Sequence, residues 1–168
     1  SACLVGSEMC IRDSSKPEDY VIIGAGSSAV IDMLGEIFIN PGDEVVYCMP
    51  SYESFPDMVN DYGGKRVEIP LTADYHFDLD GMYEAVTEKT KLVVVVNPNN
   101  PTGTYINGSK IEEFIRKVHE KAARLHPDDD QDVVVVVDEA YYEYVDDPTH
   151  YSMIEMVQKG YDLSLIHI

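Results

Sequence analysis

The chain has 168 residues, of which 45% are hydrophobic, and a formal net charge of −19. This length and composition allow one domain or one large lobe with a sizeable core. The strong negative charge repels phosphate backbones and anionic lipid surfaces, which excludes nucleic acid and membranes as expected partners.

The two ends of the chain resemble foreign sequence. Residues 9–14 and residues 163–168 can be encoded by DNA strings that are reverse complements of each other, as the ends of a sequencing adapter would be. Segments of that origin are left out of fold reasoning. We therefore expect residues 1–14 and 163–168 to be adapter-derived and residues 15–162 to be native. Cys48 is then the only native cysteine, which favours a reduced, cytoplasmic setting without disulfides.

Short runs rich in valine and isoleucine alternate along the chain with segments of helical periodicity. Strands are predicted at residues 20–23, 45–49, 67–69, 92–96 and 133–137. Most of these runs lack polar alternation, which is typical of strands buried on both faces of a parallel sheet. Helices are predicted at residues 28–39 and 109–125, where apolar side chains recur on one face. These side chains are Val30, Ile31, Leu34, Ile37 and Phe38 in the first helix and Ile111, Phe114, Ile115, Val118 and Ala122 in the second. The alternation predicts an α/β domain, a mostly parallel sheet flanked by helices, with ligands at the carboxyl ends of the strands.

The first motif, Gly-Ala-Gly-Ser-Ser-Ala at residues 24–29, follows a predicted strand and opens a predicted helix. Glycines permit a tight turn there, and the exposed amides of the helix start can hold a phosphate. The motif also fits a dinucleotide-binding fingerprint, although the next strand ends in Cys48 and Met49 rather than in an acidic residue. Taken alone, the motif is interpreted first as a glycine turn with Ser27 or Ser28 as the helix cap.

Two further motifs follow later strands. Residues 133–140 read Val-Val-Val-Val-Val-Asp-Glu-Ala, similar to the magnesium-binding strand of nucleotide hydrolases, but the chain contains no matching phosphate-binding loop. Residues 97–103, Asn-Pro-Asn-Asn-Pro-Thr-Gly, form a proline-rich loop after the strand at 92–96. The acidic stretch at residues 126–132 does not match a calcium-binding loop and is interpreted as a surface turn, so no metal site is expected.

Together and in this order, the motifs resemble the cofactor site of fold-type I pyridoxal-phosphate-dependent aminotransferases. The matching segments are residues 26–28, 50–52, 97–103 and 138–141, and the resemblance extends over residues 20–162. Within the family, the chain looks most like histidinol-phosphate aminotransferases, which implies a role in histidine biosynthesis. The resemblance implies that residues 15–162 are part of the large, pyridoxal 5'-phosphate-binding domain.

The resemblance also implies roles for single residues. Asp138 would pair with the pyridine nitrogen of the cofactor and keep it protonated. Asn100 and Tyr141 would hydrogen-bond the phenolic oxygen of the ring. We expect these three residues to form the catalytic set. Taken singly, Asp138 is also explained as a strand-end cap, Asn100 as a turn residue and Tyr141 as core packing.

The remaining predicted contacts hold the cofactor in place. Tyr52 would stack on the ring face, and the turn at Gly26 with Ser27 and Ser28 would take the phosphate. Core packing for Tyr52 and helix capping for the serines are the alternative interpretations. Many family members have an acidic pair at the positions of Ser28 and Ala29, so this chain departs from the family pattern there.

The resemblance further implies what this chain lacks. The family links its cofactor to a lysine some tens of residues beyond the aspartate motif and grips the substrate carboxylate with a later arginine. None of the lysines in residues 15–162 has the expected serine-rich context, so we expect this fragment to be inactive and its parent to be a homodimer. The parent would transfer an amino group from a small-molecule donor to 2-oxoglutarate, a 2-oxo acid. An aromatic aminotransferase, a carbon-sulfur lyase, a threonine-phosphate decarboxylase, a dinucleotide-binding domain and a non-catalytic binding domain are the alternatives.

Overall fold

The computed structural model describes residues 3–5, 21–127, 133–159 and 163–167. Its strands are β1 (Cys3–Val5), β2 (Val21–Ile22), β3 (Glu44–Met49), β4 (Lys65–Pro70), β5 (Thr90–Val96), β6 (Val134–Asp138) and β7 (Leu163–His167). Its helices are α3 (Ser27–Phe38), α4 (Ser54–Asp61), α5 (Leu79–Ala85), α6 (Gly108–Leu125) and α7 (Ile154–Gln158), with one 3-10 turn, η1 (Tyr142–Tyr144).

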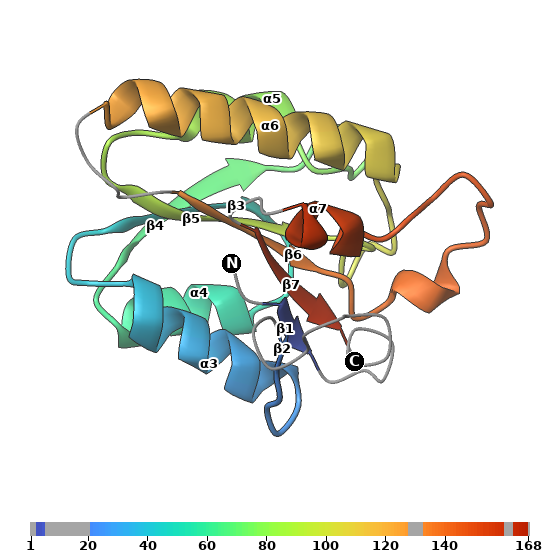
Figure 1. Ribbon diagram of the computed structural model, residues 1–168, viewed down its shortest axis with the longest axis horizontal. Helices are drawn as coiled ribbons and strands as arrows, with labels where there is room; N and C mark the ends of the chain where they lie inside the picture. Colours follow the sequence, from blue (N-terminus) through green and yellow to red (C-terminus); the bar gives the residue numbers. More distant parts are fainter. Residues whose placement is uncertain (1–2, 6–20, 128–132, 160–162, 168) are drawn as a thin grey trace.

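The strands form one seven-stranded sheet in the order β2-β1-β7-β6-β5-β3-β4. Every described strand pair is parallel, which confirms the predicted parallel sheet. In Figure 1, α3 and α4 lie on one side of the sheet, and α5 and α6 lie on the other. Because both faces are covered, β3, β5 and β6 are buried along most of their length, as their uninterrupted apolar runs predicted.

The five predicted strands are all present, with shifted ends. The largest shift is in β4, which spans Lys65–Pro70 rather than residues 67–69, because the charged residues at its start belong to an edge strand with exposed side chains. The strand predicted at residues 20–23 is described only as Val21–Ile22, since residue 20 lies outside the described residues.

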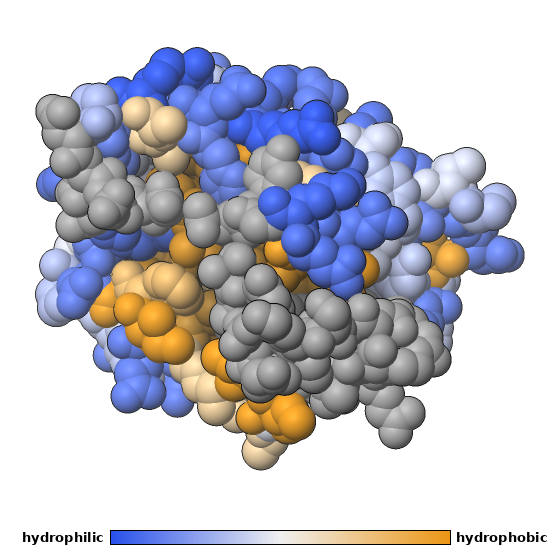
Figure 2. Space-filling model, in the orientation of Figure 1, coloured by the Kyte–Doolittle hydropathy of each residue, from blue (hydrophilic) through white to orange (hydrophobic). Residues whose placement is uncertain are grey.

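The two predicted helices are also present. In α6, the predicted apolar face is buried throughout: Ile111, Phe114, Ile115, Val118 and Ala122. In α3 the prediction was partly wrong, because Ile37 was assigned to the buried face and is 60% exposed. Apolar surface gathers over α3 in the view of Figure 2, whereas the surface over α6 is mostly hydrophilic.

Both segments expected to be adapter-derived contribute a strand. β1 pairs with β2 and β7, and β7 also pairs with β6. Strand pairing reflects backbone hydrogen bonding and apolar burial, which do not depend on the origin of a sequence. The domain boundaries at residues 14 and 163 therefore stay a prediction.

The sequence also led to expectations about cysteine chemistry, membrane spans and metal sites. Cys48 is a free thiol buried in β3, and burial raises its pKa to about 12, so it is held in the unreactive protonated form. Among the described residues, no helix is both long and apolar enough to cross a bilayer. In the same ranges, no group of three or more His, Cys, Asp or Glu side chains could hold a metal ion. Most of the acidic stretch at residues 126–132 lies outside the described residues.

Candidate active site

The predicted site residues follow the carboxyl ends of four strands. Gly26 follows β2, Tyr52 follows β3, Asn100 follows β5, and Asp138 is the last residue of β6. Since the sheet is parallel, these strand ends share one edge. The register places Val96 of β5 opposite Asp138, so the loop that begins at Asn97 starts directly beside the aspartate.

Asp138 is buried, with 2% of its surface exposed. Its Oδ1 atom accepts a hydrogen bond from the backbone amide of Ala140 at 3.0 Å, and its backbone oxygen accepts one from the amide of Asn97 at 2.8 Å. The first of these bonds is the strand-end cap that the sequence suggested as an alternative. A carboxylate held at low exposure interacts strongly with any nearby cation, because little water screens it.

Tyr52 lies near Asp138 and near the start of α3. Hydrogen bonds from Ser54, and then from Ser28 and Ser27, lower the pKa of its hydroxyl group below the ordinary value, while the charge of Asp138 acts in the opposite direction. The hydroxyl therefore lies near the serines at the helix start and within the electrostatic reach of the aspartate. The ring is half-buried and packs edge-on against Phe55, with 6.5 Å between centroids.

The start of α3 has the features of an anion site. Gly26 adopts φ 82°, in the left-handed region that favours glycine, and precedes the first helical residue, Ser27. The first turn of α3 contains no acidic side chain, and no side chain caps it. The interpretation of Ser27 or Ser28 as the cap was therefore wrong, because Gly26 occupies that position. The uncapped amides of a helix N-terminus favour a phosphate group.

Asn100 and Tyr141 line one cavity of about 450 Å³ together with Tyr105 and Tyr144. Tyr141 is 45% exposed and stands 6.2 Å from the ring of Tyr144, so it does not serve as core packing. A second cavity, of about 290 Å³, is lined by Tyr52 and also by Asn100. Asn100 thus lines both the cavity that contains Tyr52 and the cavity that contains Tyr141.

The segment after Tyr141 is fastened to the segment after the proline-rich loop. The hydroxyl of Tyr105 donates to Asp147 Oδ2 at 2.9 Å, and Asn107 Nδ2 donates to Thr149 Oγ1 at 3.0 Å. Of these residues, Tyr105 also lines the cavity that Asn100 and Tyr141 share.

Several buried polar residues of the site were not identified from the sequence. Glu139 is 1% exposed, and its carboxylate accepts hydrogen bonds from Ser152 Oγ at 2.5 Å and from the amide of Met153 at 2.9 Å, which ties the segment before α7 to the end of β6. Asn97 and Asn99 are 1% and 3% exposed. The sequence showed three asparagines in one loop, but offered no means of telling the buried pair from Asn100.

These residues fit pyridoxal 5'-phosphate. A buried carboxylate suits a protonated pyridine nitrogen, an uncapped helix start with serines suits the phosphate, and a half-buried tyrosine suits the ring face. Ser27, Ser28 and Asp138 all lie close enough to Tyr52 to change the pKa of its hydroxyl group, so the groups suited to the phosphate, the ring and the pyridine nitrogen are near one another.

Comparison with known proteins agrees with this fit. The family model of class I and II aminotransferases matches residues 4–167. The chain is 45% identical over 131 residues to an aromatic amino acid aminotransferase of Corynebacterium diphtheriae, covering 78% of this chain and 35% of the relative. It is 36% identical over 139 residues to histidinol-phosphate aminotransferase 1 of Idiomarina loihiensis, covering 83% of this chain and 35% of that protein.

A solved structure gives the same result. The histidinol-phosphate aminotransferase of Sinorhizobium meliloti in complex with pyridoxal 5'-phosphate superposes with a TM-score of 0.64 at 26% identity, over 76% of this chain and 32% of that one. The chain therefore spans about a third of the length of the relatives that it matches.

Proposed function

Because the chain belongs to the family of class I and II aminotransferases, we propose that the whole protein transfers an amino group from a ring-bearing donor to a 2-oxo acid such as 2-oxoglutarate. Histidinol phosphate is the first candidate donor. The observation that supports the proposal is the convergence of Asp138, Tyr52 and the serines of α3 on one edge of the sheet.

Each residue has one task in this mechanism. When bound, pyridoxal 5'-phosphate withdraws electrons from the bonds at the α-carbon of the donor. Asp138 keeps a proton on the pyridine nitrogen by charge pairing at low exposure. Asn100 and Tyr141 donate hydrogen bonds to the phenolic oxygen from the cavity that they share.

The other residues bind and orient. The amides at the start of α3, with the hydroxyls of Ser27 and Ser28, hold the phosphate, and Gly26 supplies the turn that aims them. Tyr52 covers one face of the ring and excludes water from it. The covalent lysine and the arginine for the substrate carboxylate belong to parts of the protein that the family resemblance places beyond residue 162.

Aromatic amino acids are the second candidate donors. The 45% identical relative is an aromatic amino acid aminotransferase, and the cavity beside Asn100 is lined by three tyrosines and two prolines. Its charged lining residue is Asp146, a carboxylate, which suits an aromatic ring better than a phosphate ester. Homodimer formation and a cytoplasmic location stay predictions.

The first experiment is to read the gene across both ends of this sequence and to express the complete protein. We expect it to bind pyridoxal 5'-phosphate and to transfer amino groups to 2-oxoglutarate from histidinol phosphate or from phenylalanine, and the ratio of kcat/KM for the two donors decides between them. Activity with neither donor, in a protein that holds the cofactor, would reject both candidates.

The Asp138→Asn variant tests the site directly. It keeps the shape of the side chain but loses the charge, so we expect kcat to fall on the order of 100-fold with little change in folding. The exposed Asp57 of α4 gives the matched control, Asp57→Asn, which should leave kcat unchanged. Equal rates for both variants would show that Asp138 does not contact the cofactor.

A further inference from the structure

Asn99 is held by hydrogen bonds at both ends of its side-chain amide. Its Oδ1 atom accepts from Ser51 Oγ at 2.8 Å, and its Nδ2 atom donates to the backbone oxygen of Pro50 at 3.1 Å and to Thr102 Oγ1 at 2.9 Å. With 3% of its surface exposed, the side chain exchanges few of these bonds for water.

The bonds of Asn99 join two loops that each present a predicted cofactor contact. Ser51 directly precedes Tyr52, and Asn99 directly precedes Asn100. A bond between Ser51 and Asn99 therefore limits how far the two following residues can move apart, because each of them is only one peptide unit away from the bond. Tyr52 and Asn100 both line the same cavity of about 290 Å³.

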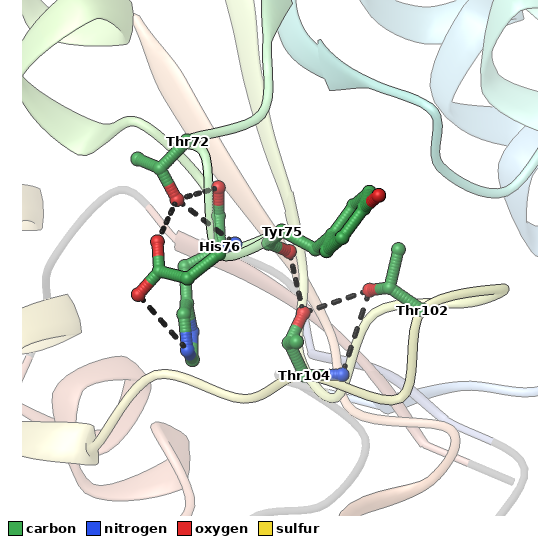
Figure 3. Close-up of polar contacts among 6 residues, drawn as sticks. Thr72, Tyr75, His76, Thr102 and Thr104 are labelled. Atoms are coloured by element: carbon green, nitrogen blue, oxygen red, sulfur yellow. Dashed lines mark hydrogen bonds and ion pairs between the residues drawn. The ribbon is translucent and has the colours of Figure 1, made fainter.

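A third loop supports this connection. Figure 3 shows Thr102 beside Thr104, and Thr104 reaching the loop that holds Tyr75. The two threonine hydroxyl oxygens lie 2.7 Å apart. Thr104 Oγ1 donates to the backbone oxygen of Tyr75 at 2.7 Å. Tyr75 adopts φ 64°, in the left-handed region, and its loop is closed by Thr72. The loop that holds Tyr75 therefore stabilises the position of Thr102 through Thr104, and Thr102 in turn stabilises the position of Asn99.

We propose that Asn99 is a positioning residue, which sets the separation between Tyr52 and Asn100 and thereby the position of a ring stacked on Tyr52 relative to the side-chain amide of Asn100. This inference rests on the proposed function for its consequence, since the contacts of Tyr52 and Asn100 with pyridoxal 5'-phosphate belong to that proposal. The side-chain amide of Asn99 is engaged with Pro50, Ser51 and Thr102, so we assign it the role of holding its neighbours in place.

Alanine substitution in the complete protein tests the proposal. Asn99→Ala removes all three side-chain bonds, so we expect affinity for pyridoxal 5'-phosphate to fall about tenfold, the equivalent of about one net hydrogen bond. We also expect the pH midpoint of the absorbance band of the bound cofactor to shift, because Asn100 would move relative to the phenolic oxygen. The matched control is Asn60→Ala on the exposed surface of α4, which should change neither quantity.

A second variant breaks the bond between the two loops by changing Ser51 instead of Asn99. Ser51→Ala removes only the bond to Asn99 Oδ1, so it should shift the same two quantities by a smaller amount. In the double variant the effects should be less than additive, because both substitutions break the same bond. Hydrogen exchange without cofactor should rise in residues 50–54 and 97–104 together in Asn99→Ala.

The outcomes separate this inference from the proposed function. If Asn99→Ala lowers stability but leaves cofactor affinity within about twofold and the absorbance midpoint unchanged, Asn99 is only a structural residue and the inference is wrong. If the wild-type protein binds no cofactor, the proposed function fails. Hydrogen exchange then still tests whether Asn99 connects the loop at residues 50–54 to the loop at residues 97–104. Faster exchange in both loops keeps Asn99 as their link, whereas a rise confined to residues 97–104 overturns it.

Discussion

Replacing Asn97 with alanine tests how the loop that presents Asn100 is closed. Asn97 is 1% exposed and pairs with the backbone of Ile106 in both directions. Its Oδ1 atom accepts from the amide of Ile106 at 2.7 Å, and its Nδ2 atom donates to the oxygen of Ile106 at 3.0 Å. The side chain thus takes the place of a strand partner at the base of the loop.

The cost of Asn97→Ala follows from the two groups that it leaves behind. Ile106 is 8% exposed, so its amide and carbonyl would be left buried without these partners. A buried group that loses its hydrogen bond costs about 1–3 kcal/mol, which gives about 2–6 kcal/mol for the pair. Because water can enter from the neighbouring cavities, we expect the lower half of this range, about 2–4 kcal/mol. That loss is a large fraction of the stability of about 5–15 kcal/mol that is typical of a domain.

Urea unfolding of the 168-residue chain, followed by circular dichroism, measures this loss. Asn60→Ala on the exposed face of α4 is the control and should change the free energy of unfolding by less than about 0.5 kcal/mol. A loss below about 1 kcal/mol for Asn97→Ala, at unchanged denaturant dependence, would refute the view that Asn97 closes the loop.

Two further predictions concern packing and pH. In Gly35→Ala the added Cβ would overlap the ring of Tyr62, so thermal denaturation should show a loss of about 1–3 kcal/mol. The better helix propensity of alanine alone predicts a gain of about 1 kcal/mol, and a rise in Tm would therefore contradict the packing argument. Burial lowers the pKa of His150 below its ordinary value of 6.5, against the opposing charges of Glu139 and Asp147. Below pH 6.5 the unfolded chain then binds a proton that the folded chain excludes, so the free energy of unfolding should decrease as the pH is lowered. The His150→Leu variant should lack this part of the pH dependence. The free energy of unfolding of the wild-type chain and of His150→Leu, at about pH 7.5 and about pH 5.5, measures this pH dependence. The same change in free energy between the two pH values in both proteins would contradict a buried neutral His150.

The buried strands could be predicted from the sequence because their side chains are apolar without interruption. The same reasoning did not find α4 and α5. Helix α4 has eight residues with Pro56 in its first turn and no side-chain cap, so its periodic signal is short. Helix α5 contains Gly81, whose amide donates to the capping Asp78, and this glycine looks like a turn in sequence. Short helices of this kind are stabilised mainly by packing against the sheet, which the sequence does not display.

The site could be predicted as far as its motifs follow strand ends. The order of the motifs placed Asp138 and Asn100 on the same edge of the sheet, and the structure agrees. The separate roles of the three asparagines in the proline-rich loop could not be predicted. Asn97, Asn99 and Asn100 have the same side chain and differ only in their hydrogen-bond partners. Nor did the sequence show the exposure of Ile37, since helical spacing alone does not reveal how far the neighbouring elements reach.

The composition of β4 has a consequence for association between chains. β4 is the last strand at one edge of the sheet, so one side of its backbone has no strand partner among the described residues. Lys65, Arg66 and Glu68 place charges along this strand, and Pro70 at its end has no amide to donate. A strand from another molecule would have to desolvate these charges in order to pair. This edge is therefore protected against the edge-to-edge stacking through which exposed sheets aggregate.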